Sequence, residues 1–241
     1  MTRKRLFLHI GTHKTGTTSF QESLLKNAPA LIARGLRPIR EPRMRQGIKR
    51  PGLRASLFTF AELFMRPDLL TGARFRQNVP NLTPPQRRNR LKVMAKRLNT
   101  LDDPALLLST EALCFLRTPT EQNLMREFLA GIDRDVTTLV TFRSTGDWRA
   151  SWLSQLAKSP DLFDAVHARP PENRITADWY FDKNAIRQFW GPFGLREFSY
   201  EQADDMLDVL YGELGIVAGE LAPMRRLNLR RVPGPNDPTP K

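Results

Sequence analysis

The stretch FLHIGTHKTGTTSF, residues 7–20, joins a short apolar run to a glycine loop and then to a segment that can form a helix. Gly11 and Gly16 have the spacing of the phosphate-loop pattern G-x-x-x-x-G-K-S/T, but Thr17 stands where that pattern requires lysine. A lysine occurs earlier, at Lys14 inside the loop. A strand, a glycine loop and a helix in this order favour an anion site, because the helix N-terminus offers free N–H groups and a positive dipole end.

The missing lysine disfavours a magnesium-dependent kinase or NTPase. In ATP-hydrolysing loops that lysine neutralises the β- and γ-phosphates, while a hydroxyl and a nearby aspartate hold Mg²⁺. The other apolar runs do not supply that aspartate, since residues 104–110 lead into Glu111 and residues 135–142 lead into Arg143. A loop that binds an anion without metal fits better, although a glycine turn with no ligand is the alternative. The donors would be backbone amides and the hydroxyls of Thr15, Thr17, Thr18 and Ser19.

Composition predicts one fairly large globular domain, because the chain has 241 residues of which 40% are hydrophobic. No run approaches the roughly 18 apolar residues of a membrane-spanning helix, and the apolar run of residues 6–10 is too short for a signal peptide. We therefore expect a cytoplasmic protein. Cys114 is the one cysteine, so no internal disulfide can form, and we expect it to be buried.

The formal net charge of +13 points to anionic partners such as nucleic acid, an acidic membrane, a polyanionic glycan or nucleotide phosphates. Residues 34–54 carry eight arginines and lysines against Glu41 alone. This segment is either a solvated basic loop or an electrostatic funnel for an anionic donor or acceptor.

Apolar runs separated by helix-compatible segments predict a parallel β-sheet flanked by helices, an α/β fold. The expected strands are residues 5–10, 104–110, 135–143 and 195–200. The expected helices are residues 17–27, 29–35, 55–65, 84–99, 120–131, 144–159, 184–194 and 203–216. Ser19 and Glu22 also fit a capping box. We predict a single domain over residues 1–230, with a basic, proline-rich insertion at 36–100 and a disordered tail at 231–241.

Ligands of such sheets bind beyond the carboxyl ends of the strands. The glycine loop, Glu111 and Arg143 each follow an expected strand, so we expect all three at one edge. Four tryptophans more often pack in cores than stack on a ligand, although adenine stacking by one of them is the alternative; they are Trp148, Trp152, Trp179 and Trp190.

Residues 12–19, THKTGTTS, resemble the 5′-phosphosulfate loop of sulfotransferases that use 3′-phosphoadenosine-5′-phosphosulfate (PAPS). The matching positions are Lys14, Thr15, Gly16, Thr17 and Thr18, with Ser19 in the next loop position. A second family motif places an arginine at a strand end and a serine eight residues later on the following helix, which FRSTGDWRAS matches with Arg143 and Ser151. DWRASWLSQLAK, WGPFG, SYE and RRLNL resemble the bacterial branch, whereas residues 36–100 show little likeness.

The resemblance implies a P-loop-like sulfotransferase fold and transfer of a sulfuryl group from PAPS to an acceptor hydroxyl or amine, without a metal. It assigns Lys14 to the leaving group, and Thr15 to Ser19 to the 5′-phosphate. Arg143 and Ser151 would bind the 3′-phosphate. The acceptor region would be residues 36–100, with a carbohydrate or glycolipid as one fitting acceptor and nucleic acid disfavoured.

The family's general base is a histidine in cytosolic members and a glutamate in glycosaminoglycan-modifying members. We favour Glu111, with His13 as the second candidate, while the alternative for Glu111 is a cap or an arginine partner. We expect His9 in the core, and we assign no role to His167. The competing hypotheses are a P-loop kinase or NTPase, a basic nucleic-acid-binding module, and a degenerate sulfotransferase fold that binds nucleotide without turnover.

Overall fold

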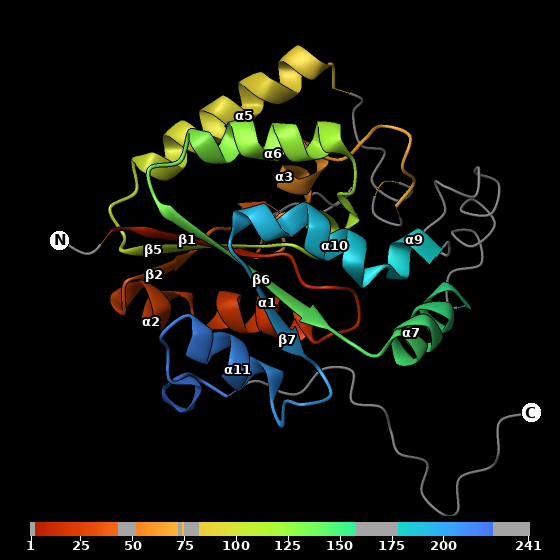
Figure 1. The fold of residues 1–241 in the computed structure, drawn as a ribbon. Helices are drawn as coiled ribbons and strands as arrows, with labels where there is room; N and C mark the ends of the chain where they lie inside the picture. The colour runs from red at the N-terminus through yellow and green to blue at the C-terminus, as the bar shows by residue number, and fades with distance from the viewer. Residues whose placement is uncertain (1–2, 43–51, 72–73, 75–81, 158–177, 224–241) are drawn as a thin grey trace, which may run out of the picture.

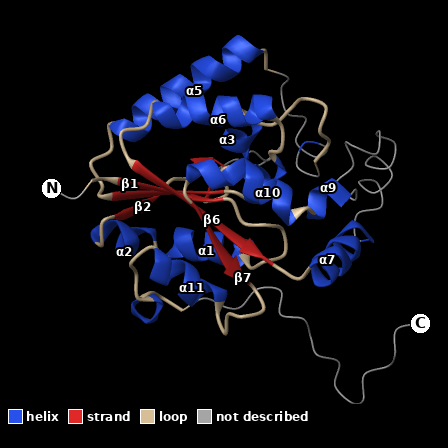
Figure 2. Ribbon diagram, viewed as in Figure 1, coloured by secondary structure: helices blue, strands red, loops and turns tan. Residues whose placement is uncertain are grey.

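The structure is a computed structural model that describes residues 3–42, 52–71, 74, 82–157 and 178–223. Its centre is a five-stranded sheet in which every neighbouring pair is parallel, lying between two layers of helices (Figure 2). The strand order is β2 (Leu36–Pro38), β5 (Ala105–Ser109), β1 (Arg5–His9), β6 (Asp135–Phe142) and β7 (Leu195–Ser199). The predicted α/β class with a parallel sheet flanked by helices is therefore confirmed.

Helices cover both faces of the sheet (Figure 1). One face carries α1 (Thr17–Lys26), α2 (Ala28–Ala33) and α11 (Met206–Glu213). The other carries α3 (Phe58–Glu62), α5 (Pro84–Asn99), α6 (Pro119–Ala130) and α10 (Lys183–Trp190). Two further helices, α7 (Thr145–Ala157) and α9 (Asp178–Phe181), lie toward the carboxyl end of β6. Short elements complete the described chain: β3 (Glu41–Pro42), β4 (Leu53–Arg54) and the 3₁₀ turns η1 (Glu111–Phe115), η3 (Gly191–Phe193) and η4 (Ala218–Glu220).

The central strand β1 is buried on both faces, as expected of a parallel strand covered by two helix layers. Leu6 and Leu8 belong to the apolar cluster on the α5–α6 side, and Phe7 belongs to the cluster on the α1–α11 side. Phe20 and Leu24 of α1 pack into the same cluster as Phe7. Their spacing of four residues predicted this shared face.

One local prediction is wrong: Ser19 and Glu22 do not form a capping box. Helix α1 begins at Thr17, and its N-cap is Gly16, with φ of 83° and no side-chain hydrogen bond. Ser19 therefore lies inside the first turn, where a helical backbone replaces the extended one that an N-cap requires. The left-handed conformation of Gly16, which glycine adopts readily, fixes where the helix starts.

The segment that sequence patterns read least well, residues 36–85, contributes β2, β3, β4 and α3. These strands are two or three residues long, too short for an alternating pattern. Helix α3 covers only part of the helix expected at residues 55–65: it ends at Glu62, and Leu63, Phe64 and Met65 are buried beyond its end. Helix α5 has the expected bounds, with a capping box at Thr83.

Several expectations fall outside the described residues: the tail at 231–241, the RRLNL segment and His167. Cys114 is buried, as predicted. Within the described ranges, no helix combines the length and apolarity needed to cross a membrane.

Candidate anion site at the carboxyl edge of the sheet

The loop after β1 is fastened to the longer neighbouring strand β6. His9 pairs with Ser109 of β5 and Leu139 of β6, so β6 continues to Phe142 after β1 has ended. The Ile10 N–H donates to the Leu139 carbonyl at 3.0 Å. Because β5, β1 and β6 are adjacent and parallel, the glycine loop, Glu111 and Arg143 meet at one edge, as predicted.

Three backbone positions give the loop its shape. Gly16 and Lys14 have positive φ values of 83° and 69°, and Lys14 is the one non-glycine residue with positive φ among those described. A Cβ on Gly11 would lie 2.9 Å from both Thr17 Oγ1 and His9 Nε2, so glycine permits close packing there. Left-handed backbone at a lysine costs on the order of 1–2 kcal/mol, and such strain concentrates at functional sites.

Buried threonine hydroxyls hold the loop closed from inside. Thr12 donates to the Thr141 carbonyl at 2.8 Å. The hydroxyls of Thr15 and Thr17 both donate to the Thr12 carbonyl, at 2.6 and 3.3 Å. Contact of these two hydroxyls with a phosphate stays a prediction, because the structure engages them in shaping the loop.

The first turn of α1 contains backbone N–H groups that have no partner within the helix. The earliest bond of this helix runs from the Phe20 N–H to the Gly16 carbonyl, and no side chain caps the helix start. The amides of Thr17, Thr18 and Ser19 precede that bond, and such N–H groups have no partner within a helix. Together with the positive end of the helix dipole, they suit a phosphate group.

Lys14 joins the loop to α7 and to β6. Its ammonium donates to Gln155 Oε1 at 2.7 Å, and its carbonyl accepts a hydrogen bond from Arg143 Nη1 at 3.3 Å. Two predicted site residues, Lys14 and Arg143, are thus in direct contact.

Arg143, which follows the end of β6, has a buried side-chain nitrogen that lacks an acceptor among the described residues. Its guanidinium carbon lies 5.1 Å from the centre of the Tyr200 ring. Its Nε is shut off from solvent and has no hydrogen-bond partner in the part of the chain that the structure describes. A buried N–H without an acceptor is costly, and a phosphate oxygen would satisfy it with a charge-assisted bond.

Ser151 lies on α7, one helical turn before Gln155. Residues four apart share a helix face, so Ser151 is on the face that meets Lys14 through Gln155. The buried face of the same helix carries Trp148 and Trp152, which confirms their expected packing role. Convergence of Ser151 and Arg143 on one phosphate stays a prediction.

Glu111 is held by a residue that the sequence did not single out. Its Oε2 accepts a hydrogen bond from Gln21 Nε2 at 2.9 Å, and the same amide also donates to Ser109 Oγ at 3.3 Å. Ser109 Oγ lies 2.8 Å from His9 Nδ1. The signal for Gln21 was its place four residues after Thr17, on a helix face that is buried beside the loop.

Both histidines of this edge are kept neutral. Burial lowers the pKa of His9 to about 4, opposed by the negative charge of Glu111. Burial also lowers the pKa of His13, again opposed by Glu111, with Lys14 lowering it further. The His13 ring centre is 5.2 Å from those of Phe115 and Trp152. The lowered pKa leaves the His13 imidazole unprotonated at neutral pH but also makes it a weaker base. The choice between Glu111 and His13 as base stays a prediction.

A scan against family models gave no match, and neither did a search of curated proteins. Among solved structures, the chain is similar to a sulfotransferase from Alicyclobacillus acidocaldarius. That similarity has 16% sequence identity and a TM-score of 0.49, and covers 90% of this chain and 82% of the other. Among the described residues, no group of three or more His, Cys, Asp or Glu side chains could hold a metal ion.

Proposed function

We propose that the protein is a sulfotransferase that moves a sulfuryl group from PAPS to a hydroxyl or amine of an acceptor, for example a carbohydrate or glycolipid. One observation carries the proposal. Lys14, in a strained backbone conformation at the N-terminus of α1, is fastened by its ammonium to Gln155 and by its carbonyl to Arg143.

The residues at this edge fit a nucleotide with phosphates at both its 5′ and 3′ positions. The amides of Thr17, Thr18 and Ser19 offer a cradle for the 5′-phosphate. The unpartnered Nε of Arg143 offers a donor to a second phosphate, with Ser151 as its proposed partner. When bound, PAPS would supply the sulfuryl group and a phosphate leaving group.

Each side chain then has a definite task. The Lys14 ammonium stabilises negative charge that develops on the leaving group, since a donor fixed in advance reorganises little during reaction. Glu111 takes the proton of the acceptor. Gln21 donates to Oε2 of Glu111, which orients the carboxyl group and leaves Oε1 for the acceptor.

The observed loop gives less support to a kinase or NTPase. Such enzymes use the lysine after the second glycine to neutralise the β- and γ-phosphates. The Thr17 hydroxyl, in the position that pattern assigns to lysine, donates to the Thr12 carbonyl, and Lys14 lies before Gly16.

The decisive test is calorimetric titration with 3′,5′-adenosine bisphosphate and, separately, with ATP and Mg²⁺, at two salt concentrations. We expect the bisphosphate to bind without metal and more tightly than Mg-ATP. Preference for Mg-ATP would support the kinase alternative, and binding of neither nucleotide would remove the donor site. A response to salt alone, equal for all anions, would indicate non-specific attraction to a chain of +13 charge.

A further inference from the structure

Beside the candidate site, an aromatic cluster surrounds Tyr180 of α9. The ring centres of Phe115 and Trp152 lie 5.6 and 5.3 Å from that of Tyr180. The His13 ring of the glycine loop is 6.0 Å away, and Trp179 lies 6.1 Å away on the other side. The cluster therefore runs from the proposed reaction centre outward to α9.

This cluster contains hydrogen-bond donors that have no acceptor. They are Nε and Nη2 of Arg117, Nε1 of Trp152 and Nε1 of Trp179, each shut off from solvent and without a partner among the described residues. The Tyr180 hydroxyl beside them interacts with the Trp148 side chain and keeps its own proton to donate. Buried polar groups are nearly always paired, because an unpaired one costs about 1–3 kcal/mol. Several unpaired donors in one cluster indicate an acceptor-rich ligand.

Arg117 is the charged member of the set. Its Nη1 donates to the Leu116 carbonyl at 2.8 Å and to the carbonyl of Cys114. The buried Nε and Nη2 on the other edge of the guanidinium have no acceptor within the described ranges. Its guanidinium carbon lies 5.9 Å from the centre of the Trp179 ring. Burial lowers the pKa of Arg117, as expected for a cation withdrawn from water.

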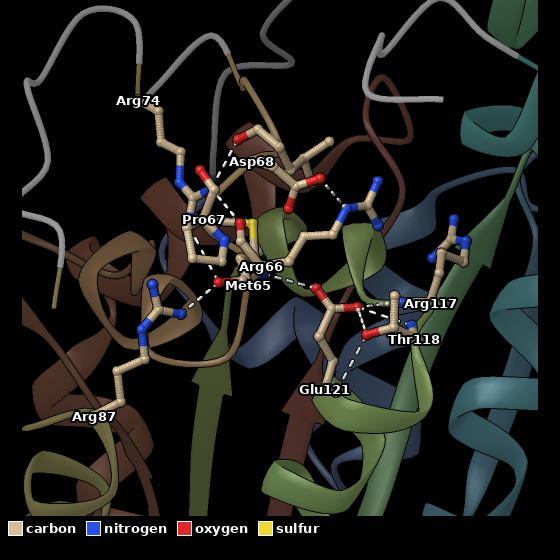
Figure 3. Close-up of polar contacts among 10 residues, drawn as sticks. Met65, Arg66, Pro67, Asp68, Arg74, Arg87, Arg117, Thr118 and Glu121 are labelled. Atoms are coloured by element: carbon tan, nitrogen blue, oxygen red, sulfur yellow. Dashed lines mark hydrogen bonds and ion pairs between the residues drawn. The ribbon is translucent and has the colours of Figure 1, made fainter. Parts of the chain in front are cut away.

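The buried carboxylate of Glu121 acts on this guanidinium through its charge, as does Asp182, but forms no ion pair with it. Its oxygens accept hydrogen bonds at 2.9 Å from the backbone N–H groups of Arg66, Arg117 and Thr118. The Thr118 hydroxyl adds a further bond at 2.9 Å. Figure 3 shows the Arg117 side chain extending away from Glu121, so the cation has no carboxylate partner among the described residues.

We propose that Arg117, with Tyr180, Trp152 and Trp179, forms a subsite for an oxyanion carried by the acceptor: a carboxylate, sulfate or phosphate group. The Nε–Nη2 edge of arginine is a fork that matches two oxygens of one such group. The neighbouring hydroxyl and indole N–H groups donate to further oxygens, while the aromatic faces pack on apolar atoms of the acceptor.

The subsite lies close in sequence to Glu111, the proposed base. Glu111 begins η1 and Arg117 follows its end, so the two residues flank the same short turn. An acceptor with a hydroxyl at one end and an oxyanion at the other would span them. The role as acceptor subsite rests on the proposed function, but oxyanion binding itself can be measured without PAPS.

The test uses the wild-type chain, R117M and R88M, titrated with glucuronate, glucose and inorganic sulfate at fixed ionic strength. R88M is the matched control because it removes the same charge from α5. Arg88 pairs with Glu127 at 3.0 Å, and both side chains are exposed. We expect glucuronate to bind the wild type and R88M alike, and R117M at least tenfold more weakly. Glucose should bind the wild type more weakly than glucuronate, and competition by inorganic sulfate would identify the oxyanion as the recognised group.

A direct readout guards against misfolding of R117M. The Arg117 Nε–H resonance of the ¹⁵N-labelled wild-type chain, assigned by its loss in R117K, should shift saturably with glucuronate and not with glucose. An unmoved resonance, or equal binding of glucuronate by wild type, R88M and a folded R117M, would overturn the proposal. These outcomes do not depend on whether 3′,5′-adenosine bisphosphate binds.

Discussion

Strand β6 has a buried or partly buried arginine at each end, and the two are bonded very differently. Arg134 precedes the strand and donates to three carbonyls, those of Asp103 at 2.8 Å, Leu98 at 3.5 Å and Leu101. Arg143 follows the strand and donates to one carbonyl, that of Lys14, at 3.3 Å. Nε of both is unpartnered. At the amino end of the sheet the arginine is bonded to three backbone carbonyls, whereas at the carboxyl end one such bond is found among the described residues.

Two lysines beside β1 show the same difference. Lys4 enters the strand with its backbone carbonyl bonded to the Asp135 N–H and its ammonium 3.2 Å from Asp102. Lys14 leaves it in a left-handed conformation, bound to a neutral amide. The amino end holds an ordinary ion pair at Lys4, whereas the left-handed backbone of Lys14 lies at the edge where ligands of parallel sheets bind.

The largest effect is expected at Glu111. E111Q should slow transfer from labelled PAPS by about 10²–10⁴-fold, the usual contribution of a general base, with little change in affinity for 3′,5′-adenosine bisphosphate. The acceptor is first chosen by screening with the wild type. The amino-end control is D103N, which breaks the 2.6 Å pair with Arg37 and should leave the rate unchanged. Wild-type turnover in E111Q would transfer the role of base to His13.

Lys14 is expected to follow closely. K14A removes the donor proposed for the leaving group, and loss of one such preorganised donor typically costs about 10²–10³ in kcat. K4A removes the same charge at the other end of β1 and should change kcat little. A K14A enzyme as fast as K4A would exclude Lys14 from the chemistry, provided that circular dichroism shows both variants folded.

The third prediction concerns how the free energy of unfolding depends on pH. The folded-state pKa of His9 is lowered by burial from 6.5 to about 4, so the unfolded chain binds a proton that the folded one does not between these values. Stability from neutral His9 is therefore present above pH 6.5 and lost as pH falls toward 4, by roughly 3 kcal/mol. Compared with the wild type, H9Q should show a smaller loss of unfolding free energy between pH 7 and pH 4. Parallel curves in urea titrations would contradict the burial of a neutral His9.

The sequence predicted the elements that obey a strong local rule. The apolar run of residues 104–110 and the glycine loop predicted β5 and the start of α1 nearly as observed, and the helix expected at residues 84–99 is α5. It missed β2, since three residues at a sheet edge carry no periodicity. It predicted that Lys14, Glu111 and Arg143 lie at one edge of the sheet, because each stands at a strand end or in the loop, and their roles there stay predictions.

Gln21 and Arg117 escaped sequence analysis for a physical reason. A glutamine inside a helix and an arginine in a basic chain are unremarkable until the fold places them. Gln21 matters because its amide meets both Glu111 and Ser109, which are 90 and 88 residues away along the chain. Arg117 matters because its neighbours leave two nitrogens without acceptors. Whether a donor finds an acceptor depends on its neighbours in the folded structure, and a single sequence does not show which residues those are.

The smallest effect is expected for Arg134 and Arg143, the two arginines that flank β6. R143M should weaken binding of 3′,5′-adenosine bisphosphate by about 2 kcal/mol, roughly thirtyfold, because a charge-assisted bond to the 3′-phosphate is lost. Binding of adenosine 5′-phosphosulfate should change much less. R134M should do the reverse: it strips donors from buried carbonyls and lowers unfolding free energy by about 1–3 kcal/mol, with nucleotide affinity unchanged. If both variants lose stability alike and neither loses affinity, the two ends of β6 do not differ in function, and Arg143 is a structural residue like Arg134.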